Sequence, residues 1–378
     1  MARPVYSSFL QPATYPSGCG RREFPDDHVA PARCAGVLKA DAYGLDAAKI
    51  APLLHREGCR TFFVAQLCEA FDIRDAVGAD SDILILNSLD PDDEARCAKG
   101  GFIPELNSRA QVERWRRQAR ANGEPLPAAL QVDSGMSRLC LDSPAVASLA
   151  GDPDSSREIS LRLIMTHLAC ADQMDHAAND MQLGRFRSDC LLFPNVPASI
   201  VNSGGVFLSR DYHLDLARAG ISLFGASAGA HAGRLRPVLR LDARILQIRE
   251  IGAGTGVGYD LDYVAPVARR IATIGVGYGD GWPRSLGGVG AACFDGHRLP
   301  VVGRVSMDSL TIDISGLPAH ALHEGDLVEL LGPSQSLAEV VPDAGTISYE
   351  ILTRLGVRHQ RICADGDRIV ASVAGRRQ

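Results

Sequence analysis

Residues 34–65 read CAGVLKADAYGLDAAKIAPLLHREGCRTFFVA, and this stretch decides the fold. Two short apolar runs rich in β-forming residues, CAGVLK (34–39) and TFFVA (61–65), flank the segment AAKIAPLLHREG, whose apolar residues recur at helical spacing and which closes with glycine. A strand, a helix and a second strand in this order predict a parallel sheet with crossover helices.

The same alternation continues toward the C-terminus through six further apolar runs and through amphipathic stretches such as SRAQVERWRRQARANG. One run contains Pro104, which disfavours an internal strand position, so its assignment is the least secure. Eight strands in this arrangement predict an α/β fold, a (β/α)8 TIM barrel. The six further runs are DILIL (82–86), GFIPEL (101–106), ALQVD (129–133), LRLIMTH (161–167), ASIVNS (198–203) and HLDLAR (213–218).

The pattern changes after SLFGA (222–226), where a Gly/Ala/His-rich linker leads into strand-like segments separated by turns, with no long helix for most of their length. These segments predict a C-terminal mostly-β domain. Residues 1–32 show neither strand nor helix periodicity. We therefore expect an irregular N-terminal segment (1–32), a barrel domain (33–230) and a β-domain (231–378).

Composition narrows the class of partner. A net charge of −6 and a pI of about 5.9 provide no broad basic field for nucleic acid or anionic lipid, so we expect a small-molecule partner. Ten scattered cysteines without a C-x-x-C pair favour reduced thiols in the cytoplasm and no metal site. No apolar run approaches the length of a membrane span, which favours a soluble protein.

The active site of such a barrel lies at the C-terminal ends of its strands. Each polar side chain there, taken alone, is more often structural than functional, but their occurrence on five strand ends favours one shared site. The strand ends carry Lys39 (first), Arg138 (beyond the fifth), Thr166 and His167 (sixth), Asn202 to Gly205 (seventh), and Arg218 with Gly220 and Ile221 (eighth).

The loops after the seventh and eighth strands predict a phosphate site. NSGG (202–205) and AGIS (219–222) consist of small residues that let backbone N–H groups approach an anion, and barrels commonly hold phosphate at this position. A lysine opposite these loops suggests a Schiff base with an aldehyde cofactor.

Several blocks of the sequence resemble a known protein family. The segment GVLKADAYGLDAAKIAPLL resembles the cofactor-lysine signature of the alanine racemases, and further blocks similar to that family follow in the same order over residues 34–361. The blocks are QVDSGMSRLC, MTHLACADQMDH, VNSGGVFL, DLARAGISLFG, GVGYDLDYVAP, IGVGYGDGWPR, LPVVGRVSMDSLTIDIS and GTISYEIL.

The resemblance implies a role for each matching residue. Lys39 would bind pyridoxal 5'-phosphate and act as one catalytic base, with Tyr259 as the opposing base. Arg218 would face the pyridine nitrogen, with His167 behind it. The remaining implied contacts are Tyr43, Asn202, Ser203, Gly220, Ile221 and Tyr349 for the cofactor, and Arg138 and Met307 for the substrate.

The implied function is interconversion of L-alanine and D-alanine by a two-base mechanism, which supplies D-alanine for peptidoglycan. In this family the tyrosine and the methionine come from a partner subunit, so the resemblance also implies a homodimer with shared active sites. The entry corridor that it implies would admit a small zwitterion and obstruct a long side chain, and it comprises Asp172, Tyr278, Arg284, Arg304 and Ile347.

Other functions stay open at this stage. One alternative is a related racemase, decarboxylase or dehydratase of the same fold that uses the same cofactor. Another is a catalytically impaired homologue that still binds the cofactor. Purified protein that binds the cofactor without racemising alanine would select the second.

The sequence departs from the family pattern in four places. Residues 1–32 lack the usual opening, and Leu45 and Asp46 follow KADAYG where His-Gly or Leu-Gly is commoner. The other two are single positions. Gln131 stands where many members carry a carbamylated lysine that steers Arg138, and its amide can accept a hydrogen bond from that guanidinium. Asp260 follows Tyr259 where glycine is usual, and a carboxylate there disfavours an ionised phenol unless it points to solvent.

Overall fold

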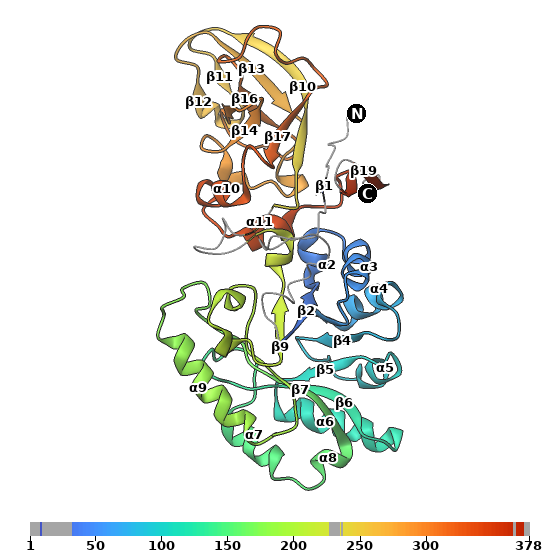
Figure 1. Ribbon diagram of the computed structural model, residues 1–378. Helices are drawn as coiled ribbons and strands as arrows, with labels where there is room; N and C mark the ends of the chain where they lie inside the picture. Colours follow the sequence, from blue (N-terminus) through green and yellow to red (C-terminus); the bar gives the residue numbers. More distant parts are fainter. Residues whose placement is uncertain (1–7, 10–31, 227–234, 236, 366–367, 374–378) are drawn as a thin grey trace. The chain divides into compact units, whose positions relative to one another are not determined.

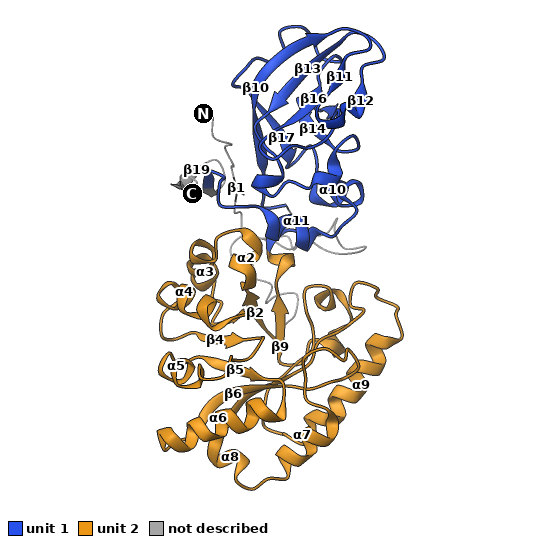
Figure 2. Ribbon diagram, turned by 180° about the vertical axis from the view of Figure 1, so that it is seen from behind, with its two compact units in different colours: residues 1–13, 224–226, 235–378 blue, residues 14–223, 227–234 orange. Residues whose placement is uncertain are grey.

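A computed structural model describes the chain except residues 1–7, 10–31, 227–234, 236, 366–367 and 374–378. The described residues divide into two compact units (Figure 2). The barrel unit lies within residues 14–223, and the β-rich unit consists mainly of residues 235–378. The domain limits expected from the sequence fall close to this division, and the exact limits stay predictions.

The barrel unit contains one sheet of eight strands in the order β8-β7-β6-β5-β4-β3-β2-β9, with parallel pairing throughout (Figure 1). Its two end strands meet, because Asp215 N donates to Ala198 O (3.1 Å) and Arg218 N to Val201 O (3.2 Å), so the sheet closes on itself. The predicted TIM barrel is confirmed. The strands are β2 (Arg33–Val37), β3 (Thr61–Val64), β4 (Asp82–Ile85), β5 (Ile103–Leu106), β6 (Leu126–Gln131), β7 (Ile159–Met165), β8 (Ala198–Ser199) and β9 (Leu216–Ala219).

Helices follow the strands along the chain. In α6, Ser108 at the N-cap accepts a hydrogen bond from Gln111 N. Gly123 ends the helix in the left-handed conformation, as its place at the end of the amphipathic stretch predicted. No helix among the described residues is long and apolar enough to cross a membrane. The barrel helices of six or more residues are α2 (Lys39–Gly44), α3 (Ala47–Arg56), α4 (Leu67–Val77), α5 (Glu94–Lys99), α6 (Arg109–Asn122), α7 (Ser143–Ala150) and α9 (Ala178–Cys190), and the single turn α8 is Ser155–Glu158.

The barrel interior is filled by alternate residues of its strands. One buried cluster contains Val37, Phe63, Ile103, Ala129 and Leu163 together with neighbours at the same strand parity. Because side chains alternate across a strand, the next residues of the same parity also point inward. Glu105 on β5, Gln131 on β6 and Arg218 on β9 follow this rule and lie on the inner face of the ring.

The β-rich unit has a six-stranded antiparallel sheet in the order β15-β14-β17-β10-β13-β16. A second sheet joins β1 (Ser8–Phe9) in parallel to β18 (Arg361–Asp365), which pairs with β19 (Arg368–Val373). Ser8 and Phe9 are thus a strand where the sequence predicted irregular structure, and most of residues 1–32 lie outside the described part of the chain. The other elements are β10 (Leu241–Ile251), β11 (Gly256–Val257), β12 (Tyr263–Val264), β13 (Arg269–Ile274), β14 (Ala291–Phe294), β15 (His297–Pro300), β16 (Leu310–Asp313), β17 (Leu327–Leu331), α10 (Leu337–Ala344) and α11 (Ser348–Arg354).

The first barrel strand ends earlier than the sequence suggested, at Val37, and Lys39 begins a tight turn. Four consecutive residues, Ala40 to Tyr43, have φ near +55° and form a left-handed helical turn. Such a turn is unfavourable for residues with a Cβ, by about 1–2 kcal/mol each. Strain of this kind concentrates where a side chain must be aimed, and here it follows directly after Lys39.

We expect Ala40→Gly to stabilise the chain by roughly 0.5–1 kcal/mol. Glycine relieves the left-handed strain of about 1–2 kcal/mol, while the freer unfolded chain takes back about 0.4–1 kcal/mol. Ala40 is exposed, so no packing is lost. Urea unfolding followed by circular dichroism measures the change.

The control is Ala121→Gly, the same substitution at an exposed position in the right-handed helix α6. There glycine should destabilise the chain by about 0.5–1 kcal/mol. Equal losses at both positions would contradict the left-handed turn at Lys39.

Candidate active site

The turn that carries Lys39 is anchored by two carboxylates. Glu69 on α4 accepts hydrogen bonds from the backbone N–H groups of Ala40 (2.7 Å), Ala65 (2.7 Å) and Gln66 (3.0 Å). Asp41 accepts one from the N–H of Ala47 (2.8 Å). These bonds tie the turn to the starts of the next two helices, so the lysine leaves the sheet in a defined direction.

Lys39 lies in a positively charged setting. Burial lowers the pKa of its amine, and the charges of Arg138 and Arg218 lower it further. Glu105 and Glu69 act in the opposite direction but with less effect. A lowered pKa favours the neutral amine, which is the form that attacks an aldehyde.

Arg218 is the buried cation of the barrel interior. Its Nη1 donates to Ser199 Oγ (2.5 Å), and its Nη2 donates to Thr166 O (2.7 Å) and lies 3.3 Å from His167 Nδ1. Burial lowers the pKa of the guanidinium to about 10, which leaves it protonated at neutral pH. Arg218 is therefore a fixed cation oriented by groups at the ends of two neighbouring strands, β7 and β8.

His167 lies between this arginine and the loop after β8. Its Nε2 is 3.3 Å from Asn202 Nδ2, and Asn202 Oδ1 accepts a hydrogen bond from Gly205 N (2.9 Å). Burial and the charges of Arg218, Arg138 and Lys39 lower the pKa of the imidazole well below its usual value. The ring is therefore neutral at physiological pH, and Nδ1 accepts from Arg218.

The loops after β8 and β9 meet in a cradle of hydrogen-bond donors. Ser203 Oγ accepts from Gly220 N (2.9 Å) and from Ser222 N (3.3 Å). A Cβ at Gly220 would lie 2.2 Å from the hydroxyl oxygen of Tyr43, so only glycine permits this approach. The buried Ser222 hydroxyl has no hydrogen-bond partner among the described residues.

These residues fit a phosphorylated aldehyde. Ser203 and Ser222 bring hydroxyl groups to this loop pair, next to Gly220 and the Tyr43 hydroxyl, where an oxyanion finds donors. Lys39 supplies an amine for the aldehyde, and Arg218 a guanidinium for a ring acceptor. The structure thus gathers Lys39 and the other barrel residues named from the sequence at one end of the barrel, the C-terminal ends of its strands.

Arg138 lies in the exposed loop after β6. Asp133 shapes this loop, since its Oδ1 accepts from the N–H groups of Gly135, Met136 and Ser137. Gln131 donates from Nε2 to the carbonyl of Leu139. The amide therefore supports the loop backbone, whereas the sequence suggested that it accepts from the Arg138 guanidinium.

The remaining predicted residues belong to the β-rich unit. Tyr259 begins a short turn and is 67% exposed, and Met307 is 54% exposed. Tyr349 lies in α11 and is partly exposed. Because this unit is described by itself, the structure does not bring these three side chains to Lys39.

Arg304 binds the carboxylates next to Tyr259. Its Nη1 donates to Asp260 and its Nε to Asp262. Asp260 has φ of 56°, so the turn is strained where Tyr259 leaves it. The arginine compensates the negative charge that the sequence placed beside the phenol.

Sequence reasoning missed Glu105. This side chain is 1% exposed and neither of its carboxyl oxygens accepts a hydrogen bond from a described residue. Pro104 made the strand assignment less secure. The alternation of side chains along the strand was nevertheless a usable signal, because Glu105 lies two residues after the inward-pointing Ile103 and so points into the barrel as well.

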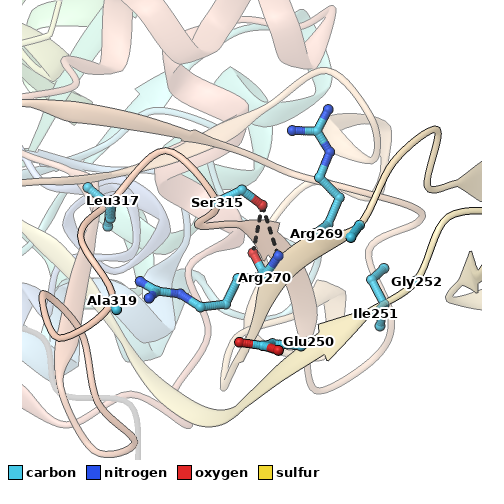
Figure 3. A pocket seen from close by; sticks show the side chains of 9 residues that line it. Glu250, Ile251, Gly252, Arg269, Arg270, Ser315, Leu317 and Ala319 are labelled. Atoms are coloured by element: carbon cyan, nitrogen blue, oxygen red, sulfur yellow. Dashed lines mark hydrogen bonds between the residues drawn. The ribbon is translucent and has the colours of Figure 1, made fainter.

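A separate hollow of about 540 Å³ lies in the β-rich unit (Figure 3). Its arginines are engaged in the structure, since Arg270 donates to Pro318 O (2.9 Å) and Arg269 lies 3.4 Å from Asp313. It contains none of the residues predicted for the site. The lining residues are Glu250, Ile251, Gly252, Ala268, Arg269, Arg270, Ser315, Leu317 and Ala319.

Comparison with known families matches both units. The family model "Alanine racemase, N-terminal domain" matches residues 25–228, and "Alanine racemase, C-terminal domain" matches residues 238–363. A protein of Mesorhizobium japonicum named "Alanine racemase, catabolic" is 48% identical over 329 residues, which cover 87% of this chain and 86% of the relative. One of Brucella canis named "Alanine racemase" is 45% identical over 348 residues, 88% of each chain.

Solved structures agree with these relatives. Alanine racemase from Bartonella henselae with covalently bound pyridoxal phosphate has a TM-score of 0.88 and 38% identity, and the match covers 96% of this chain and 100% of that one. Biosynthetic alanine racemase from Pseudomonas aeruginosa has a TM-score of 0.84 and 30% identity, with 97% and 100% coverage.

We expect Gly220→Ala to weaken binding of pyridoxal phosphate, used as a probe, by roughly tenfold to hundredfold. The new Cβ displaces the Tyr43 hydroxyl or the turn, and a lost hydrogen bond to a charged group costs about 1.5–3 kcal/mol. Fluorescence or absorbance titration of cofactor-free protein gives the two dissociation constants.

The matched control is Gly184→Ala, at an exposed position in α9 where a Cβ meets nothing within 4 Å. This variant should bind the probe as the parent does. If Gly220→Ala also binds like the parent, the cradle at Gly220 is not the phosphate site.

Proposed function

The chain belongs to the alanine racemase family of pyridoxal-phosphate-dependent isomerases, and from this premise we propose how its own residues interconvert L-alanine and D-alanine. The single observation that carries the proposal is the cluster of Lys39, Arg218 and the Ser203–Gly220 cradle at one end of the barrel. These groups can bind the aldehyde, the ring nitrogen and the phosphate of a single ligand.

In the proposal, Lys39 holds the cofactor and serves as the base on one face of the substrate. Its lowered pKa supports both roles, because each needs the neutral amine. When bound, pyridoxal phosphate supplies a conjugated ring that makes the α-proton of the amino acid acidic. Lys39 then takes or returns a proton through Nζ.

Arg218 keeps its own proton throughout. Its pKa of about 10 and its bonds to Ser199 and Thr166 hold the guanidinium charged and in place, so it can donate to a ring nitrogen but hands over no proton at neutral pH. A guanidinium that keeps its proton at this position would favour prompt return of the proton to the substrate.

Tyr259 is the proposed base on the opposite face. Inversion requires one base on each side, because a single base would return the proton to the face it came from. The Arg304 bonds to Asp260 and Asp262 support this role, since they compensate the carboxylate charge next to the phenol. They also weaken the case for the catalytically impaired homologue, because Asp260 was the departure that disfavoured an ionised Tyr259.

We further propose that Tyr259 and Met307 act in the site of a second copy of the chain, with Arg138 and Met307 contacting the substrate and Tyr349 the phosphate. The exposure of Tyr259 and Met307 supports completion of a site on another subunit. The corridor residues named from the sequence would then favour alanine over longer amino acids.

For the physiological role, we propose that the enzyme works in the cytoplasm and supplies D-alanine for peptidoglycan. Relatives bear both catabolic and biosynthetic names, so growth experiments have to distinguish the two roles. Deletion of the gene should make the cell require D-alanine. Loss of growth on D-alanine as a nitrogen source, without that requirement, would favour the catabolic role.

The activity test is formation of D-alanine from L-alanine, with a coupled assay. We expect the parent to racemise alanine and Lys39→Ala to lose activity by several orders of magnitude. Borohydride reduction and peptide mass mapping should place the pyridoxyl group on Lys39. A pyridoxyl group on a different lysine would contradict the assignment, and bound cofactor without racemisation would indicate the impaired homologue.

The shared site is tested by mixing inactive Lys39→Ala with inactive Tyr259→Phe. A mixed dimer contains one site with both substitutions and one site with neither, so up to about half the sites of each mixed dimer should be active. Mass spectrometry verifies subunit exchange. An inactive mixture despite exchange places both bases in the same chain.

A further inference from the structure

Glu105 is a buried acid without an assigned role. It lies on β5, between β4 and β6 in the closed sheet, and shares its inward parity with Ile103 of the interior cluster. It is 1% exposed, and neither carboxyl oxygen has a hydrogen-bond partner among the described residues. A buried carboxyl normally has partners, so its position requires an explanation.

The charged groups that face Glu105 are those of the proposed active site. They are Arg218 from β9, Arg138 from the loop after β6, and Lys39 from the turn after β2. Glu105 is also the charge that acts on Arg218. Glu69, the other acid that affects Lys39, is occupied by three backbone N–H groups.

Burial and charge act on Glu105 in opposite directions. Burial raises the pKa of its carboxyl to about 8, although the three cations counteract the rise. The acid therefore titrates near physiological pH, close to Lys39, whose pKa Glu105 raises when ionised. The charge of each group therefore acts on the pKa of the other.

We propose that Glu105 is a positioning residue of the racemisation, which controls the protonation of Lys39 by gaining or losing its own proton inside the barrel. The inference rests on the proposed function, because it concerns the lysine that holds the cofactor. With its proton, Glu105 adds no negative charge beside Arg138 and Arg218, and Lys39 is readily neutral. Without it, the carboxylate provides their counter-ion and Lys39 retains its proton more tightly.

The test is the pH dependence of cofactor capture. Cofactor-free parent and Glu105→Gln are mixed with pyridoxal phosphate at a series of pH values, reduced with borohydride, and the pyridoxyl group on Lys39 is measured by peptide mass. The midpoint of capture should move down in Glu105→Gln by roughly half a unit to one unit, because a favourable negative charge is removed. A merely structural role would not move this midpoint.

Two variants serve as controls. Glu94→Gln removes another buried glutamate of the barrel unit, 8% exposed and paired with Arg114 at 2.6 Å, and should leave the midpoint unchanged. Glu105→Asp keeps a titrating carboxyl on the same strand and should bring the midpoint back toward the parent value.

Stability provides a second measurement on the cofactor-free protein. The folded chain retains the Glu105 proton to about pH 8, whereas the unfolded chain releases it near the ordinary value of 4.5. Between these values the parent should lose stability relative to Glu105→Gln as the pH rises, by up to about tenfold in the folding equilibrium constant per pH unit.

If Glu105→Gln does not fold, a titration of the parent protein tests the proposal instead. In protein labelled with ¹³C at the glutamate carboxyl carbons, one resonance should titrate near pH 8, since Glu105 is the described glutamate whose pKa burial raises. Absence of such a resonance overturns the proposal. So does an unchanged capture midpoint in a folded Glu105→Gln, whereas absence of pyridoxyl on Lys39 in both proteins overturns the proposed function.

Discussion

Burial of the Arg218 guanidinium is the constraint on which the barrel unit depends. A charged group inside a protein is tolerated only when its hydrogen bonds are satisfied, and Arg218 finds acceptors on Ser199 and Thr166. These residues belong to β8 and to the end of β7, while the arginine is on β9, so the contacts connect the strands where the ring closes. The side-chain bonds that join these strands therefore also orient the cation that we propose for the active site.

In the turn after β2, an unfavourable backbone conformation is likewise stabilised by hydrogen bonds to side chains. Four residues in the left-handed region are unfavourable by themselves, and they persist because Glu69 and Asp41 hold the turn at both sides. The consequence is the direction of Lys39. A regular right-handed start of a helix would point the following residues differently, so the strained turn is part of how the chain presents its amine.

The sequence predicted what depends on local pattern and failed where distant residues decide. All eight barrel strands and the glycine end of α6 follow from apolar periodicity and turn chemistry, and Pro104 did not prevent its strand. The left-handed turn at Ala40 could not be predicted, because its four residues from Ala40 to Tyr43 include no glycine. The hydrogen bond that stabilises it comes from Glu69 on α4, far along the chain. The bond from Arg304 to Asp260 joins residues 44 positions apart, so Asp260 alone suggested only repulsion.

The interior charge explains why these features belong together. Lys39, Arg138 and Arg218 form a positive cluster that suits an anionic phosphate and lowers the pKa of the lysine, two effects of one arrangement. Positive charge without a nearby counter-ion would oppose burial of the Arg218 guanidinium, whose pKa burial already lowers to about 10. In our proposal, a single acid with a raised pKa resolves this conflict better than a permanently ionised one, because its proton can remain while the amine must be neutral and leave when the cations need a counter-ion. Glu105 lies on β5, across the closed ring from β9, and its charge acts on Lys39 and Arg218.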